Sequence, residues 1–196
     1  MIKNIIFDIG GVLFDDSDKN LEKALNKNEE EIKSISKVAF GGNFKKCLLG
    51  QLDIEDYINE LKEKSPELSN ELEYVLSPQN YNKTFPIMKD TFNLIKELKQ
   101  QGYTIYLLSN ITEASFNYIN NVIELMRYFD GGLYSYQEGM IKPNYDFYKR
   151  LLKKYNLSEK ETIFFDDKDK NIQAAKELGI KSVKFKSIDD IANNLE

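Results

Sequence analysis

Short apolar runs alternate with segments of helical periodicity along most of this chain. These runs occupy residues 5–7, 103–108, 162–165 and 181–185. Runs of this kind are typical of strands that are covered on both faces in a parallel sheet. Strands that alternate with helices predict an α/β fold with a doubly wound parallel sheet.

Helical patterns fill the spaces between these runs. Residues 86–101 carry apolar side chains at helical spacing, and Gly102 follows where a C-terminal cap is expected. Asn144 is placed to cap the start of another helix, and a third, at 171–178, ends before Gly179. We therefore expect each strand to be followed by a helix.

Residues 15–84 follow a different pattern, with helix signals and no convincing strand. Asn28 and Glu31 have the spacing of a capping box, and further amphipathic helical stretches follow. This pattern predicts a small helical bundle inserted after the first strand. The expected division is a core of residues 1–14 and 85–196, with 15–84 as the insertion.

Composition and charge exclude several kinds of function. The net charge is −5 and basic residues form no stripe, so we expect no nucleic-acid partner. The sequence has no His, which excludes Ser-His-Asp and Cys-His catalysis and all His-based metal sites. The single Cys47 is expected to be a buried thiol in a reducing compartment. The apolar N-terminal segment is too short and too polar for a signal peptide or membrane span, so we expect a cytoplasmic protein without a membrane partner.

Polar side chains follow three of the predicted strands directly. They are Asp8, the pair Ser109 and Asn110, and the pair Asp166 and Asp167. Ligands of open parallel sheets bind beyond the carboxyl ends of the strands, so these residues are expected to meet at one edge. A single Asp after a strand is usually a turn or cap residue, and the joint occurrence is what favours a site.

The adjacent carboxylates of Asp166 and Asp167 repel each other unless a cation neutralises them. Mg²⁺ suits a site made of carboxylates, a backbone carbonyl and phosphate oxygens. The alternative is a solvated turn, because acidic residues also favour the start of a helix. Lys142, held extended by Pro143, could compensate the charge of a bound phosphate, or could be an ordinary solvated lysine.

In their order and spacing, these segments resemble the motifs of the haloacid dehalogenase superfamily. The matching segments are Phe7–Asp15 with its Asp8-Ile9-Gly10-Gly11, Leu108-Ser109-Asn110, Lys142-Pro143, and Phe164-Phe165-Asp166-Asp167 with Asn171. The chain resembles phosphatase-like members with a helical cap, such as bacterial glucose-1-phosphate phosphatases. The resemblance implies a Rossmann-like core and a cap at 15–84.

The resemblance also implies roles for the residues that handle phosphate. Asp8 would be the nucleophile that accepts the phosphoryl group, with Lys142 as the second catalytic residue. Ser109, Asn110 and Lys142 would bind the phosphoryl oxygens. The substrate would be a small phosphorylated metabolite, such as a sugar phosphate.

A further implication of the resemblance is a Mg²⁺ site. Asp8, the backbone carbonyl of Gly10 and Asp167 would bind the ion, and Asp166 would bind it directly or through water. Asn171 would support this loop from the following helix.

Gly10 departs from the pattern, because most phosphatases of this superfamily have an acid–base Asp at that position. Such help typically contributes about 10²–10⁴-fold, so its loss would slow turnover without abolishing it. Asp15 and Asp16 would replace it only if their loop folded back, and a solvated flap is favoured.

Two other functions stay open from the sequence. A 2-haloacid dehalogenase also uses an Asp nucleophile, but it does not use Mg²⁺ and its fourth motif lacks this acidic pair. A binding or regulatory protein that keeps the fold with little turnover is the second. The possible cleft residues are Phe14, Phe40, Phe44 and Lys45, with core packing favoured for each Phe.

Overall fold

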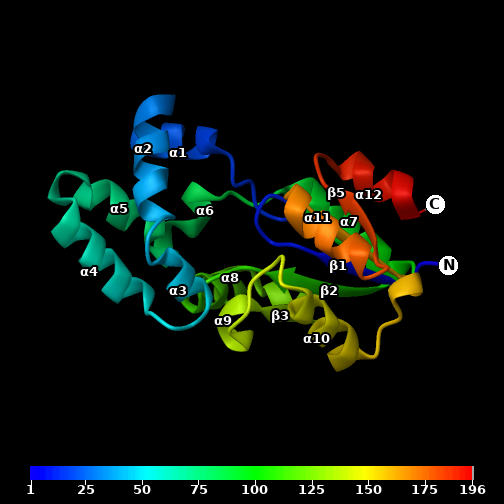
Figure 1. Ribbon diagram of the computed structural model, residues 1–196. Helices are drawn as coiled ribbons and strands as arrows, with labels where there is room; N and C mark the ends of the chain where they lie inside the picture. Colours follow the sequence, from blue (N-terminus) through cyan, green and yellow to red (C-terminus); the bar gives the residue numbers. More distant parts are fainter. Residues whose placement is uncertain (196) are drawn as a thin grey trace.

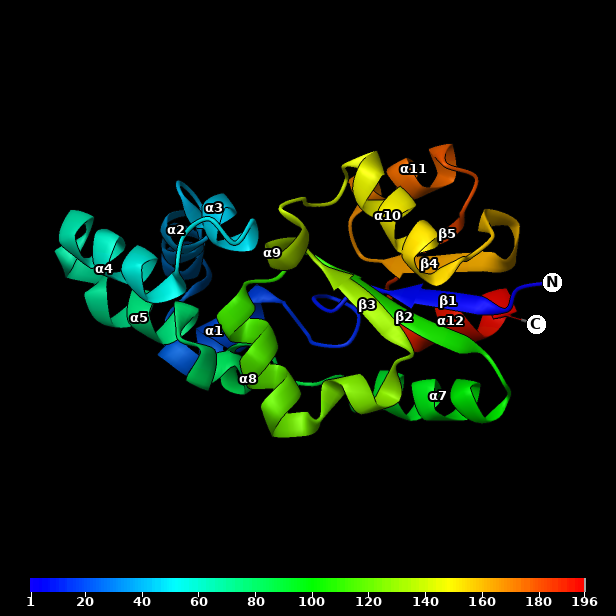
Figure 2. The same ribbon diagram turned by 90° about the horizontal axis from the view of Figure 1, so that it is seen from below.

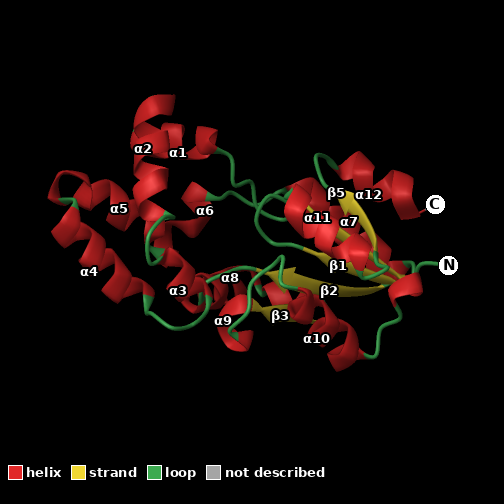
Figure 3. Cartoon of the chain, in the orientation of Figure 1, coloured by secondary structure: helices red, strands yellow, loops and turns green. Residues whose placement is uncertain are grey.

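A five-stranded parallel sheet forms the centre of the computed structural model, which describes residues 1–195 (Figures 1 and 3). Its strand order is β3-β2-β1-β4-β5. The strands are β1 (Asn4–Phe7), β2 (Thr104–Ser109), β3 (Gly131–Tyr134), β4 (Thr162–Asp166) and β5 (Lys181–Lys184). The predicted strands are all present, and the first occupies the middle of the sheet.

Helices cover both faces of this sheet, as a doubly wound fold requires (Figure 2). On one face lie α7 (Lys89–Gln100), α8 (Glu113–Ile123) and α12 (Ile188–Leu195), and on the other α10 (Tyr145–Tyr155) and α11 (Asp169–Glu177). Successive strand residues face opposite sides. Ile5 and Phe7 of β1 therefore join one hydrophobic cluster, and Ile6 joins the other. The predicted fold class is confirmed.

Strand β3 has no counterpart among the predicted elements, because its Gly131 and Gly132 interrupt any apolar run. The structure shows why glycine is needed there. A Cβ atom on Gly131 would lie 2.4 Å from the ring of Tyr155, which packs against the strand. The Tyr155 hydroxyl also accepts a hydrogen bond from Gly132 N–H at 2.9 Å. Packing with α10, and not local propensity, makes this segment a strand.

The helix boundaries differ from the predicted ones in places. The helix expected at 86–101 begins at Lys89, because the preceding residues are extended: Met88 N–H donates to Leu13 O at 2.8 Å. The helix expected at 171–178 begins at Asp169. The Asn144 cap is confirmed, since its side chain accepts a hydrogen bond from the Asp146 N–H.

The segment between β1 and β2 is helical, and its helices gather at one end of the molecule, beyond the sheet (Figure 1). They are α1 (Asp18–Leu25), α2 (Glu29–Ala39), α3 (Phe44–Leu48), α4 (Ile54–Lys64), α5 (Ser69–Leu76) and α6 (Tyr81–Thr84). A hydrophobic cluster of their own, which includes Ile32, Tyr57 and Leu72, holds α1–α5 together, whereas Tyr81 of α6 packs against the core. The division at residues 14/15 and 84/85 stays a prediction.

Local features of this insertion follow the sequence closely. The capping box of Asn28 and Glu31 is present. A 3₁₀ turn, Pro66–Leu68, precedes α5. Cys47 is buried, and this burial raises the pKa of its thiol to about 11. Within residues 1–195, no helix is both long and apolar enough to cross a bilayer.

Candidate active site

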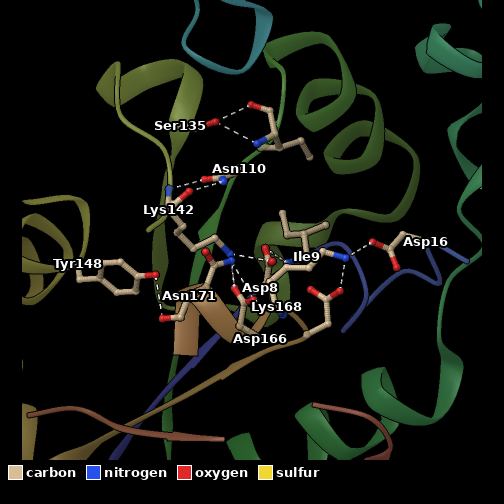
Figure 4. A network of polar contacts seen from close by, with 12 residues as sticks. Asp8, Ile9, Asp16, Asn110, Ser135, Lys142, Tyr148, Asp166, Lys168 and Asn171 are labelled. Carbon is tan, nitrogen blue, oxygen red and sulfur yellow. Dashed lines mark hydrogen bonds and ion pairs between the residues drawn. The ribbon is translucent and has the colours of Figure 1, made fainter. Parts of the chain in front are cut away.

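The carboxyl ends of β1 and β4 lie side by side and bring three carboxylates together (Figure 4). Asp8 directly follows β1, and its N–H donates to Phe165 O of β4 at 3.0 Å. Asp166 is the last residue of β4, and Asp167 follows it. One oxygen from each of the three lies within 4.8 Å of the others. Parallel pairing in register therefore assembles the acidic cluster that the sequence predicts.

Lys142 contacts this cluster from the protein interior and is buried, with 1% of its surface exposed. Its Nζ is 2.7 Å from Asp8 Oδ2 and 2.7 Å from Asp166 Oδ2. A buried ammonium group is tolerated only when it is paired, and here it has two anionic partners. Lys142 is therefore part of the site and not a solvated surface lysine.

Asn110 fixes the backbone of Lys142. Its side-chain Oδ1 accepts from Lys142 N–H at 2.8 Å, and its Nδ2 donates to Lys142 O at 3.2 Å. Both polar atoms of the amide group thus bind the backbone of a residue 32 positions away. These contacts show that the Asn110 side chain positions Lys142, and its expected binding of phosphate stays a prediction.

Asp166 is surrounded by hydrogen-bond donors. Besides Lys142, Asn171 Nδ2 lies 2.9 and 3.0 Å from the two carboxylate oxygens, and Lys168 N–H donates to Oδ1 at 2.8 Å. The Tyr148 hydroxyl donates to the backbone carbonyl of Asn171 at 3.1 Å. Asp166 is fully buried, so its carboxylate orients Lys142 and has little capacity left for a direct metal bond.

Asp167, in contrast, has a carboxylate oxygen without a hydrogen-bond donor within residues 1–195. Its Oδ1 is buried and has no hydrogen-bond partner among the described residues. Its Oδ2 pairs with Lys168. The side chain lies against Gly11, where a Cβ atom would come within 2.6 Å of Asp167 Cγ, and Gly11 has a φ of +70°. A buried carboxylate oxygen without a donor has the chemistry of a cation ligand.

Burial and the pairing with opposite charges shift the pKa values of these groups in opposite directions. Burial raises the pKa of Asp8 to about 7, although Lys142 opposes this rise. Burial acts to lower the pKa of Lys142, but Asp166 and Asp8 outweigh it and the pKa is raised. Burial acts to raise the pKa of Asp166, but Lys142 and the other donors hold this pKa below its usual value. Lys142 is therefore charged in the metal-free protein, and Asp166 is its ionised partner.

Ser109 ends β2 and is 1% exposed, at the same edge as the acidic cluster. The loop after it is held by Ser135, a residue that the sequence did not single out. Ser135 Oγ accepts from Ile111 N–H at 3.0 Å and donates to Ile111 O at 3.1 Å. Since Ser135 follows the unpredicted β3, the sequence carried no signal for it.

The loop after β1 folds back toward Gly10. A Cβ atom at Gly10 would have a single neighbour within 4 Å, the Asp16 Oδ2 at 3.9 Å. Lys168 Nζ, which the sequence also did not single out, pairs with Asp16 at 3.4 Å. Asp16 is exposed, in agreement with the expected solvated flap, and its carboxylate also lies close to where a residue-10 side chain would extend.

The expected packing roles of Phe14, Phe40 and Phe44 hold only in part. Phe14 is fully buried in the core. Phe44 packs against the hydrophobic cluster of the insertion, as expected, and also lines a cavity between the insertion helices and the sheet edge. Phe40 lines the same cavity, and Lys45 is not among the lining residues. Core packing was the wrong expectation for Phe40, which is 38% exposed.

Together, the fold and this edge define a hydrolase with an α/β core, whose reactive groups are carboxylates and a buried lysine. Comparison with protein families gives the particular group. The model for haloacid dehalogenase-like hydrolases matches residues 2–179, and the chain belongs to this family.

Curated relatives of similar length are phosphatases. The chain is 29% identical over 178 residues to a sesquiterpene phosphatase from Aspergillus oryzae, covering 91% of this chain and 87% of that protein. It is 28% identical over 191 residues to a D-ribitol-5-phosphate phosphatase from Bacteroides thetaiotaomicron, covering 93% and 91%. The similarity to both phosphatases extends over more than 90% of this chain.

Solved structures share the fold over the full chain. A haloacid dehalogenase family enzyme from Bacteroides thetaiotaomicron, in complex with magnesium and inorganic phosphate, superposes with a TM-score of 0.77 at 22% identity, covering 100% of both chains. An L-2-haloacid dehalogenase from Xanthobacter autotrophicus gives 0.69 at 19% identity, covering 100% of this chain and 82% of that one. At these identities the likeness establishes the fold alone.

Replacing Lys142 with Met should lower the free energy of unfolding by about 3–5 kcal/mol, because Asp166 would stay buried without its cation. Urea unfolding of the metal-free protein at pH 7 measures this change. Lys153→Met is the matched control, since Lys153 is an exposed lysine of α10. Equal stability of the two variants would show that the buried ion pairs are not needed to hold this edge together.

Proposed function

We propose that the chain is a Mg²⁺-dependent phosphatase that hydrolyses a small phosphate monoester through an aspartyl-phosphate on Asp8. The observation that carries the proposal is the arrangement of three carboxylates within 4.8 Å above a buried, doubly paired Lys142. The phosphatase relatives support it, as does the magnesium and phosphate complex of the structural neighbour.

In the first step, Asp8 attacks phosphorus, so that a bond to its carboxylate oxygen forms while the bond to the ester oxygen breaks. In the second, water cleaves the aspartyl-phosphate and releases phosphate. A carboxylate that approaches a phosphate anion meets a repulsion of about 4 kcal/mol at 4 Å and intermediate dielectric. Lys142 offsets this repulsion and, with Ser109, holds the phosphoryl oxygens.

The residues present fit a Mg²⁺ ion. Asp8, Asp167 and the backbone carbonyl of Gly10 would hold it, and the unpartnered Oδ1 of Asp167 is the observation that supports this choice. Asp166 would contact the ion through water, because Lys142, Asn171 and Lys168 already occupy its oxygens. Bound there, Mg²⁺ would neutralise charge on the transferring phosphoryl group.

Proton transfer at the ester oxygen needs a group other than residue 10. We assign it to Asp16, because its Oδ2 is near the space left by Gly10 and it lines the same cavity. Lys168 holds the carboxylate in this position. Asp16 would donate a proton to the departing oxygen and then accept one from the attacking water.

A 2-haloacid dehalogenase shares the fold and a nucleophilic Asp, but the acidic cluster argues against that activity here. Asp167 places a second carboxylate beside Asp8, which would repel a haloacid carboxylate unless a cation were bound. A protein without turnover is the remaining alternative, and the following experiments distinguish it.

Asp8→Asn should abolish hydrolysis of p-nitrophenyl phosphate, lowering kcat by at least about 10³-fold, because the amide cannot act as the nucleophile. Excess EDTA should stop the native enzyme, and Mg²⁺ should restore it. Asp169→Asn, a change at an exposed residue nearby, is the control. Undiminished activity of Asp8→Asn, or activity unaffected by EDTA, would overturn the mechanism.

The affinity for Mg²⁺ should fall with pH below about 7. Burial raises the pKa of Asp8 to about 7 in the metal-free protein, so below that pH Mg²⁺ must displace a proton. Calorimetric titration should give a Kd about tenfold weaker at pH 6 than at pH 8. A Kd that is equal at both pH values would contradict direct ligation by Asp8.

Asp16→Asn should lower kcat/KM about 10²-fold for an alkyl phosphate and only slightly for p-nitrophenyl phosphate, whose leaving group needs little protonation. Gly10→Asp in the Asp16→Asn background should restore much of the loss. Asp18→Asn is the matched control, since Asp18 is exposed and lines the same cavity. Equal losses for the two substrates would remove Asp16 from proton transfer.

A further inference from the structure

A cavity of about 320 Å³ extends from the acidic edge of the sheet into the helical insertion. Gly10 and Asn110 form part of its wall, so it is continuous with the candidate active site. A phosphate monoester bound with its phosphorus at Asp8 would therefore direct its organic group into this space. Cavities of this size hold small organic ligands.

The wall of the cavity is largely apolar. All six helices of the insertion and the loop after β2 contribute to it, and its apolar side chains include Leu21, Phe44, Leu76, Phe85 and Ile111. Aromatic rings form a connected part of this wall. Phe40 lies 5.3 Å from Phe44 and 6.4 Å from Phe85, measured between ring centroids. Apolar side chains form the larger part of the surface offered to the organic group, and polar side chains such as Ser36, Thr112 and Ser115 form the rest.

Phe40 shows that this surface is not covered by the protein itself. Its side chain is 38% exposed and faces the cavity, whereas most large apolar side chains of the chain are buried. Exposed aromatic surface in a concave site gains free energy when a ligand covers it.

Charge on the cavity wall also limits what fits. Among the described residues, the lining contains no Lys or Arg, and its charged members are Asp16 and Asp18. A second phosphate or a carboxylate on the substrate would meet only negative charge there. The hydroxyls of a polyol would lose water without gaining partners where they face the apolar side chains, which form the larger part of the wall.

We propose, building on the phosphatase function above, that the substrate is the monophosphate ester of a neutral, apolar alcohol. The cavity binds the hydrocarbon part of that alcohol, while the sheet edge binds its single phosphate. This substrate class is an alternative to the sugar phosphate expected from the sequence, which stays a prediction.

Two matched substrates test this inference: n-hexyl phosphate and sorbitol 6-phosphate. Both are C6 esters of a primary alcohol, and the hydroxyls of sorbitol make it the slightly better leaving group. The native protein with Mg²⁺ should nonetheless show a kcat/KM at least about 30-fold higher for n-hexyl phosphate. In the series ethyl, butyl and hexyl phosphate, kcat/KM should rise about three- to fourfold per added methylene.

Phe40→Asn should lower the ratio of kcat/KM for n-hexyl phosphate to that for sorbitol 6-phosphate by about tenfold. Tyr145→Asn is the matched control, because Tyr145 is 41% exposed and lies outside the cavity wall. Far-UV circular dichroism checks that Phe40→Asn is folded. A Phe40→Asn ratio equal to that of the native protein would show that Phe40 does not contact the organic group.

Different results would overturn the phosphatase proposal and the apolar substrate class. If p-nitrophenyl phosphate and all the esters resist hydrolysis with Mg²⁺, the phosphatase proposal itself fails. If the enzyme cleaves p-nitrophenyl phosphate but acts on sorbitol 6-phosphate at least as fast as on n-hexyl phosphate, the phosphatase stands and the apolar substrate class is overturned.

Discussion

The buried ammonium group of Lys142 between Asp8 and Asp166 is the contact on which the rest of the site depends. Its Nζ lies 2.7 Å from a carboxylate oxygen of each. An unpaired charge at this depth would be very costly, so the lysine and the two carboxylates can be buried only together. This requirement links β1, β4 and the loop before α10, and Asn110 adds the end of β2 to the same unit.

The adjacent carboxylates of Asp166 and Asp167 have different roles in the site. Asp166 is saturated with donors and orients Lys142, whereas Asp167 keeps a buried oxygen without a partner. The Asp167 side chain packs so closely against Gly11 that no Cβ atom would fit there. The space beside Gly10 is open, and the carboxylate of Asp16 lies next to it. Adjacent glycines thus serve different purposes: one gives close contact, and the other leaves room.

Much of this arrangement could be predicted from the sequence, because it follows from chain order. Asp8 and Asp166 come at the ends of apolar runs, and parallel strands in register bring such ends together. What could not be predicted depends on contacts between distant segments. Strand β3 exists because Tyr155 packs on Gly131, Asn110 binds a backbone 32 residues away, and Asp16 returns to Gly10 through its pairing with Lys168. Periodicity carries no signal for any of these contacts.

The central claim is that a carboxylate at the end of β1 receives the phosphoryl group. Mass spectrometry of protein acid-quenched during turnover of p-nitrophenyl phosphate with Mg²⁺ tests it most directly. The account predicts a phosphorylated peptide whose modified residue is Asp8, and that the modification disappears when substrate is exhausted. A phosphoryl group on another residue of the turning-over enzyme would contradict it.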